Sequence, residues 1–185
     1  MVEKLLFKIS KLLSQCKIPY MVIGGQAVLL YGVARLTRDI DITLGVDTDS
    51  YETIIFISKK IGLKVLPKNT KRFVEETKVL PTEDRRSRLR VDFIFSNTPY
   101  ERQALKRVKR IHLKGSSISF ASLEDLIIHK MFAGRAIDLE DTKTLMAQHK
   151  GAIDIRYIRL WLKEFSRLQD RGSLLEDFDR IKKSA

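Results

Sequence analysis

The sequence has little cysteine and no long apolar run, and each shortage excludes a class of protein. Its 185 residues include one cysteine, Cys16, which excludes an internal disulfide framework and a cysteine-based zinc site. No apolar stretch approaches the roughly 20 residues of a membrane span. Residues 1–4 are not followed by the apolar region and cleavage site of a signal peptide. We therefore expect a cytoplasmic protein without a membrane segment.

Amide side chains are also scarce, since two asparagines and five glutamines stand among many Lys, Arg, Glu and Ile residues. This composition mildly favours a thermophilic source. Hydrophobic residues make up 44% of the chain and charged residues 31%, which is typical of a globular protein rather than a disordered one. The length is near that of one ordinary domain.

Positive charge exceeds negative charge by 12, and the excess is concentrated between residues 85 and 114. Ten basic residues face only Asp92 and Glu101 there, which gives this segment a net charge of +8. Such a concentration suits a polyanion such as a nucleoside triphosphate, tRNA or another nucleic acid, although a solvated surface explains it equally well. Aromatic residues do not interleave with these charges as they would on a stacking platform for single strands. The basic residues are Arg85, Arg86, Arg88, Arg90, Arg102, Lys106, Arg107, Lys109, Arg110 and Lys114.

The pattern of apolar residues predicts an α+β fold, with a core over residues 1–120 and a helical segment over 121–185 packed on it. Glycines and prolines punctuate the predicted elements. Strands are expected at 20–23, 39–44, 63–66, 72–79, 88–95, 110–113 and 117–120. Helices are expected at 3–15, after Gly24–Gly25, at 51–61, after Pro99, and at 122–134, 138–149, 154–169 and 173–183.

The clearest alternation of the chain lies at residues 39–44, where Asp39 and Asp41 share one strand face and the isoleucines share the other. Side chains two residues apart on a strand lie about 7 Å apart, and like charges that close are unfavourable without a cation. The pair is therefore either a solvated face or a site for a divalent metal, for which Mg²⁺ is the most suitable.

A third acidic residue, Asp92, lies on the predicted strand 88–95, opposite its apolar neighbours. It can join Asp39 and Asp41 if the two strands are adjacent. Three carboxylates can bridge two metal ions about 3.5–4 Å apart, an arrangement used for in-line displacement at phosphorus.

Two further features fit a phosphate-bearing ligand, and each also has an ordinary explanation. Gly24–Gly25 joins a strand to a helix, where backbone N–H groups can approach a phosphate, or it is simply a turn. Lys130 continues an apolar helix stripe that runs through residues 123–127, so it either extends to the rim or faces a buried anion. Without nucleotide it should pair with Asp39, Asp41 or Asp138, because an unpaired buried ammonium is costly.

In this order the features resemble the nucleotidyltransferase superfamily that has the DNA polymerase beta fold. The quoted matches are Val22-Ile23-Gly24-Gly25, Arg35-x-Thr37-x-Asp39-x-Asp41 and Val91-Asp92-Phe93, followed by Glu124-Asp125-Leu126-x-x-x-Lys130 and Arg135-x-x-Asp138-x-x-Asp141. They are most similar to the small stand-alone members, namely the AbiEii-type toxins and the minimal and aminoglycoside- or lincosamide-type enzymes. Gln26 departs from the serine that many catalytic members carry after the second glycine.

The resemblance implies a mixed sheet flanked by helices, and transfer of NMP from an NTP to a hydroxyl acceptor. It implies that Asp39, Asp41 and Asp92 hold two Mg²⁺ ions, and that Gly24, Gly25, Arg38 and Lys130 bind the nucleotide. The acceptor would be RNA or tRNA, a protein or a small molecule. A toxin–antitoxin role would add an antitoxin protein as partner. The alternative is a catalytically silent module of the same fold that binds nucleic acid or nucleotide.

Overall fold

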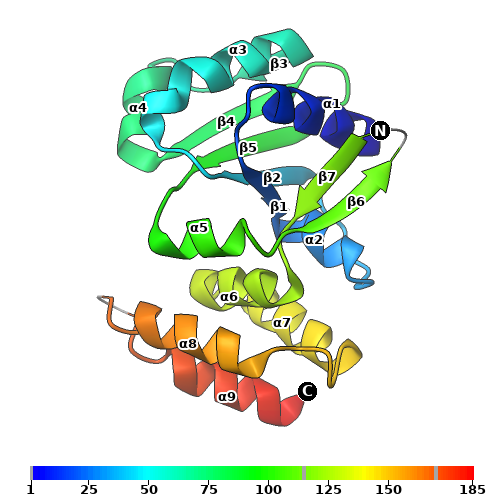
Figure 1. The fold of residues 1–185 in the computed structure, drawn as a ribbon, viewed down its shortest axis with the longest axis vertical. Helices are drawn as coiled ribbons and strands as arrows, with labels where there is room; N and C mark the ends of the chain where they lie inside the picture. Colours follow the sequence, from blue (N-terminus) through cyan, green and yellow to red (C-terminus); the bar gives the residue numbers. More distant parts are fainter. Residues whose placement is uncertain (1, 114–115, 169–170) are drawn as a thin grey trace. The chain divides into compact units, whose positions relative to one another are not determined.

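The computed structural model describes residues 2–113, 116–168 and 171–185, and it forms two compact units (Figure 1). The first unit comprises Met1–Gln26 and Leu36–Ala121, and the second comprises Ala27–Arg35 and Ser122–Ala185. The chain thus enters the second unit briefly between two strands of the first. The division into a core of 1–120 and a helical segment of 121–185 stays a prediction.

The first unit is built on a mixed sheet, whose described strands follow the order β3-β4-β5-β2-β1-β7-β6. The pairs β1–β7 and β2–β5 are parallel, and the remaining neighbours are antiparallel. The strands are β1 (Tyr20–Ile23), β2 (Asp39–Leu44), β3 (Leu63–Val65), β4 (Val79–Asp84), β5 (Arg90–Phe95), β6 (Lys109–Leu113) and β7 (Ser116–Phe120).

The two faces of the central strands differ in character, as the alternation at 39–44 predicts. Ile40 and Ile42 of β2 and Val91 and Phe93 of β5 are completely buried, whereas Asp39 on the other face is exposed. Helices α1 (Val2–Gln15) and α3 (Tyr51–Ile61) pack against each other and against the sheet (Figure 1). Their buried apolar side chains complete the core, and the acidic face is left for other contacts.

The structure corrects the strand that we predict at residues 72–79. Helix α4 (Thr70–Thr77) occupies most of the segment and ends at Lys78, which adopts the left-handed conformation with φ +59°. Val74 is its buried residue, and an Arg72–Glu76 pair at i,i+4 supports the exposed side. The remaining helical elements of this unit are the 3₁₀ turn η1 (Thr48–Ser50) and α5 (Pro99–Ala104).

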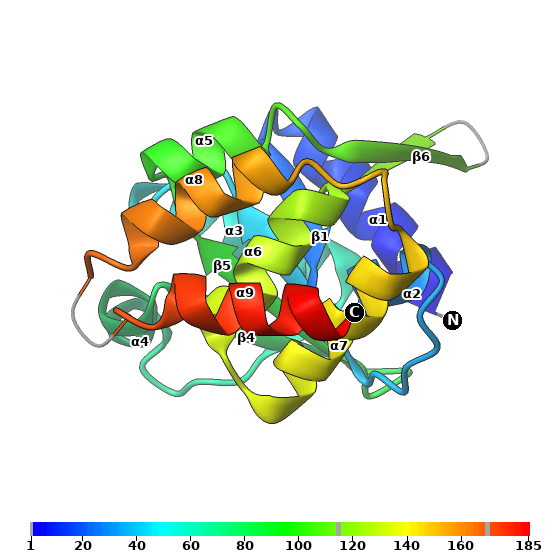
Figure 2. The same cartoon turned by 90° about the horizontal axis from the view of Figure 1, so that it is seen from below.

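The second unit is helical, and its described helices follow the predicted ones closely. Helix α6 contacts α7, α8 and α9, so these helices gather around it (Figures 1 and 2). Ser122 caps α6 by accepting a hydrogen bond from the backbone N–H of Asp125. The helices are α6 (Leu123–Ala133), α7 (Ala136–Gln148), α8 (Ile155–Phe165) and α9 (Leu174–Ser184).

A short helix, α2 (Gly24–Leu30), begins in the first unit and ends in the second. The segment after it is fixed in the second unit, where the Tyr31 and His149 rings meet edge to face with centroids 5.9 Å apart. Together these elements confirm the predicted α+β class with a mixed sheet, flanking helices and C-terminal helices. Across the described part of the chain, no helix combines the length and apolar character needed to cross a bilayer.

Candidate active site

The acidic face of the sheet brings Asp41 and Asp92 directly together. They are register partners on the neighbouring parallel strands β2 and β5. Two residues earlier on each strand, Asp39 is the register partner of Arg90. Adjacent strands lie about 4.8 Å apart, so the Asp41 and Asp92 carboxylates emerge side by side. Both are partly covered, and Asp39 is exposed at the end of the row. The strand adjacency that a shared site requires is therefore present.

Arg90 supplies the counter-charge for this row. Its Nε donates to both carboxylate oxygens of Asp92, at 2.8 and 3.0 Å. The hydrogen bond and charge of Asp92, followed by the charges of Asp39 and Asp41, raise the pKa of the Arg90 guanidinium. One arginine thus moderates the repulsion among three carboxylates, a role that the sequence alone did not suggest.

Gly24 is required by the carboxylate next to it. It follows β1 and is the first residue of α2, with φ +63°, a conformation that favours glycine. A methyl group added at its α-carbon would lie 2.1 Å from Oδ2 of Asp41, far inside contact distance. The glycine therefore lets the backbone of the β1–α2 turn approach the Asp41 carboxylate directly.

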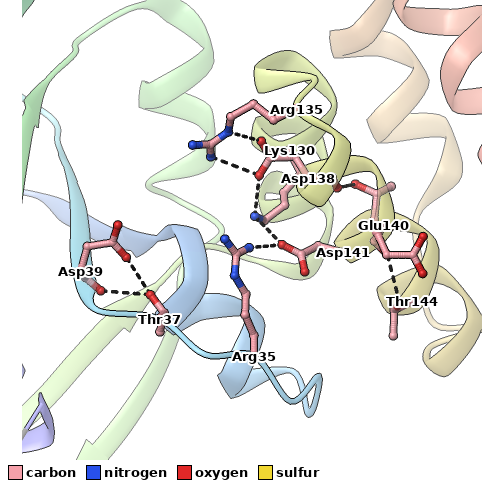
Figure 3. A network of polar contacts seen from close by, with 10 residues as sticks. Arg35, Thr37, Asp39, Lys130, Arg135, Asp138, Glu140, Asp141 and Thr144 are labelled. Carbon is pink, nitrogen blue, oxygen red and sulfur yellow. Dashed lines mark hydrogen bonds and ion pairs between the residues drawn. The ribbon is translucent and has the colours of Figure 1, made fainter.

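Gly25 and Gln26 position the Asp39 end of the acidic row, Gly25 by its close contact with Thr37 and Gln26 by a hydrogen bond to Asp39. A methyl group at Gly25 would lie 2.5 Å from Oγ1 of Thr37, so the chain before β2 crosses closely over the turn. Thr37 Oγ1 donates to Oδ1 of Asp39 at 2.7 Å (Figure 3). Gln26 Nε2 donates to the Asp39 carbonyl oxygen at 3.2 Å. Thr37 thus orients the carboxylate of Asp39, a candidate metal ligand.

Arg38 and the basic segment complete the first unit's candidate residues. Arg38 is exposed and immediately precedes β2. The basic residues 85–90 lie in and beside the β4–β5 turn, and those from 102 to 110 lie on and between α5 and β6. Lys114 lies outside the described residues.

In the second unit, Lys130 is the centre of a polar group that we call the Lys130 cluster: Arg35, Lys130, Arg135, Asp138 and Asp141 (Figure 3). The Nζ of Lys130 lies 2.8 Å from Oδ1 of Asp138 and 2.7 Å from Oδ2 of Asp141. The side chains of Lys130 and Asp138 are 4% and 1% exposed. The expected pairing with Asp138 is present, and Asp141 is a second partner.

Each carboxylate of the Lys130 cluster also has an arginine partner. Arg135 donates to Asp138, and Arg35 donates to Asp141. Burial raises the pKa of Asp138, but hydrogen bonds and charge from Arg135 and Lys130 outweigh it, and the pKa lies below its usual range. The five side chains carry three positive and two negative charges, so the cluster keeps a net charge of +1.

The donor chemistry of the acidic face fits Mg²⁺, because the ion prefers carboxylate oxygens. As the side chains stand, the described residues include no group of three or more Asp, Glu, His or Cys side chains arranged to hold a metal. In this arrangement the Asp92 carboxylate accepts from Arg90 and the Asp39 carboxylate accepts from Thr37. The carboxylate ligands and the strand register therefore suit Mg²⁺, and binding would rotate the Asp39 and Asp92 side chains toward the ion.

The sequence over residues 2–166 matches a family described as a nucleotidyltransferase of unknown function (DUF6036). The chain belongs to this family. The match establishes the nucleotidyltransferase superfamily that the Gly-Gly and Asp-x-Asp patterns indicate, without distinguishing an AbiEii-type branch. No curated protein matches the chain.

Solved nucleotidyltransferases share the fold of this family member. The lincomycin-bound lincosamide antibiotic adenylyltransferase LnuA is 23% identical, with a TM-score of 0.55 over 79% of this chain and 97% of that one. ANT(2")-Ia in complex with adenylyl-2"-tobramycin is 16% identical, with a TM-score of 0.59 over 88% and 97%. An antigenic nucleotidyltransferase-like protein from Paracoccidioides brasiliensis is 15% identical, with a TM-score of 0.55 over 95% and 93%. At these identities the likeness concerns the fold.

Proposed function

We propose that this chain is a Mg²⁺-dependent nucleotidyltransferase that moves NMP from an NTP to a hydroxyl acceptor. The observation that carries the proposal is the direct register of Asp41 and Asp92, with Asp39 on the same face and Gly24 against Asp41. Membership of a nucleotidyltransferase family supports it.

Asp39 and Asp41 would hold two Mg²⁺ ions, with Asp92 shared by one of them. The chemistry that Mg²⁺ supplies at such a site is neutralisation of triphosphate charge and acidification of the acceptor hydroxyl. Asp92 would leave Arg90 and accept the hydroxyl proton. The freed Arg90 charge then stays beside the reacting phosphate.

In the transfer itself, the acceptor hydroxyl oxygen bonds to the α-phosphorus and the bond from that phosphorus to the α,β-bridging oxygen breaks. Pyrophosphate leaves with the bridging oxygen, and the hydroxyl proton passes to Asp92. The chain contributes position and charge, which dominate this kind of chemistry. Gly24, Gly25 and Arg38 would hold phosphate oxygens from the first unit.

Lys130 would bind a phosphate oxygen of the nucleotide. The net charge of +1 on the Lys130 cluster supports this role, because a phosphate oxygen can replace one carboxylate without leaving Lys130 unpaired. Asp138 and Asp141 then act as positioning residues that hold the lysine until the nucleotide binds.

The decisive experiment combines ligand binding with product detection. The protein is incubated with each labelled NTP, Mg²⁺, and total RNA, cell extract or small hydroxyl compounds. Asp41→Asn is compared with Asp49→Asn, which makes the same chemical change at an exposed position of the first unit. At about 100 times its Kd, Mg²⁺–NTP should stabilise the native protein by about 2.7 kcal/mol.

Thermal unfolding should show that stabilisation in the parent and in Asp41→Asn lose most of it, while Asp49→Asn keeps it. Labelled product should disappear only in Asp41→Asn. An equal ligand response in the two variants would overturn the carboxylate site. Nucleotide binding without any transfer would favour the silent module, and co-purification with the product of a neighbouring gene would favour the antitoxin-bound form.

A further inference from the structure

A hollow of about 580 Å³ opens beside the acidic row of the first unit. It is lined by the loop 66–69, by Arg72, Phe73 and Glu76 of α4, and by Pro81 and Arg90 of the sheet. Its volume lies within the range of about 300–1,000 Å³ that is usual for ligand sites.

The hollow lies next to Asp92, the carboxylate of the acidic row on strand β5. Pro81 on β4 is the register partner of Asp92, so the two side chains lie on the same sheet face. Arg90 both lines the hollow and donates to Asp92. A ligand in the hollow would therefore place one end beside the carboxylate that is to accept the hydroxyl proton.

The lining has more basic than acidic side chains. Lys68, Arg72 and Arg90 provide three cations against the single carboxylate of Glu76. Arg72 is paired with Glu76, its Nε 2.7 Å from Oε1, and Arg90 is paired with Asp92, so contact with a phosphate in the hollow falls to Lys68. The arginine-rich β4–β5 turn adjoins Arg90 and extends the positive surface.

The lining also offers an aromatic face. Phe73 is 37% exposed and Leu66 is 40% exposed, although both are large apolar side chains. An exposed ring beside cations is the combination on which nucleobases stack while their phosphates are neutralised. The sequence of the basic segment lacks this aromatic partner; the fold supplies it from α4.

We propose that this hollow binds the single-stranded 3′ end of a nucleic acid, with its terminal hydroxyl at Asp92 as the acceptor of the NMP. This inference rests on the proposed function. The terminal 3′ oxygen bonds to the α-phosphorus, pyrophosphate leaves, and the proton goes to Asp92. A base of the strand stacks on Phe73, and Lys68 neutralises a backbone phosphate.

Binding is tested without chemistry, by fluorescence anisotropy of 5′-labelled RNA and DNA octamers of the same sequence, in the absence of NTP. The double variant Lys68→Gln/Phe73→Leu removes the ring and one cation from the hollow. The matched control is Lys60→Gln/Phe56→Leu on α3, where Phe56 is 54% exposed and the Lys60 Nζ lies 5.5 Å from its ring centroid. The comparison of RNA with DNA shows which strand the site accepts.

At about 50 mM salt, the Lys68/Phe73 variant should bind at least about fivefold more weakly, because one stacked base and one phosphate contact are lost. The slope of log affinity against log salt should shrink by about 0.7, the contribution of one phosphate of a single strand. The Lys60/Phe56 control should change neither quantity. Equal losses in both variants, or no octamer binding by the parent, would overturn the proposal.

Transfer is tested separately, with octamers that end in a 3′-hydroxyl or a 3′-phosphate. Both should bind, and only the hydroxyl form should gain labelled NMP. Labelling of a protein or of an amino sugar instead would overturn the acceptor while leaving the proposed transferase intact. Octamer binding without labelling from any NTP would contradict the transferase and, with it, the acceptor role.

Discussion

Replacing Lys130 by methionine removes the central charge of the Lys130 cluster and keeps most of the side-chain length. Asp138, whose side chain is 1% exposed, would then depend on Arg135, which is 69% exposed and a poor shield from burial costs. Asp141 would keep Arg35. Two charge-assisted hydrogen bonds are lost, each worth about 1.5–3 kcal/mol, while the methionine stem recovers part through packing.

We therefore expect Lys130→Met to lower the free energy of unfolding by about 2–4 kcal/mol, near the lower end of the range for breaking a buried ion pair. Urea denaturation at neutral pH, followed by far-ultraviolet circular dichroism, measures it. Lys163→Met is the control, because Lys163 is an exposed residue of the same unit and should change stability by less than about 0.5 kcal/mol.

The difference in unfolding free energy between the parent and Lys130→Met should also depend on pH in a defined direction. The folded-state pKa of Asp138 is lowered, so the stability that its partners provide is present above its unfolded pKa of about 3.9. That stability is lost as the pH falls through the folded value. The gap between parent and Lys130→Met should therefore narrow below about pH 4. Equal stability of the two proteins at neutral pH would refute the reasoning.

Two further predictions concern the acidic face. Gly24→Ala should destabilise the fold by about 1–3 kcal/mol more than Gly62→Ala. Both glycines have positive φ, but Gly24 lies against the Asp41 carboxylate, whereas nothing lies within 4 Å of a methyl group added at Gly62. Urea denaturation of the two variants measures the difference, and equal losses of stability would contradict the close approach of Gly24 to Asp41. Arg90→Met should lower stability in the absence of metal and enlarge the rise in melting temperature caused by Mg²⁺ alone. The reason is that the variant removes the arginine charge beside Asp39, Asp41 and Asp92. Arg86→Met is the control, and equal Mg²⁺ responses in the two variants would argue against Arg90 as the counter-charge.

Local patterns predict the strand faces well, because side-chain direction follows directly from strand alternation. The alternation at 39–44 places Asp39 and Asp41 opposite the buried isoleucines, and the structure agrees. The same reasoning fails at α4, where adjacent Phe73 and Val74 look strand-like. Only Val74 is buried there, and an i,i+4 ion pair suits a helix.

Contacts between distant segments set the limits of prediction from sequence. The alignment of Asp41 with Asp92 depends on which strands pair, and the contact of Thr37 with Gly25 depends on the path of the chain before β2. Of the two carboxylate partners of Lys130, Asp138 was among those expected from the sequence. Gly134, with φ +67°, turns the chain between α6 and α7 and returns Asp138 to the lysine, so the glycine was the available signal.

The insertion of residues 27–35 into the second unit has a consequence for how the protein is made. During synthesis the sheet strands from β1 to β7 can be complete once residue 121 is available, but Tyr31 and Arg35 must wait for His149 and Asp141. A nascent chain stopped near residue 120 would expose the buried Tyr31 and Val33. Such an unfinished chain would be a substrate for chaperones and proteases until its last helices emerge.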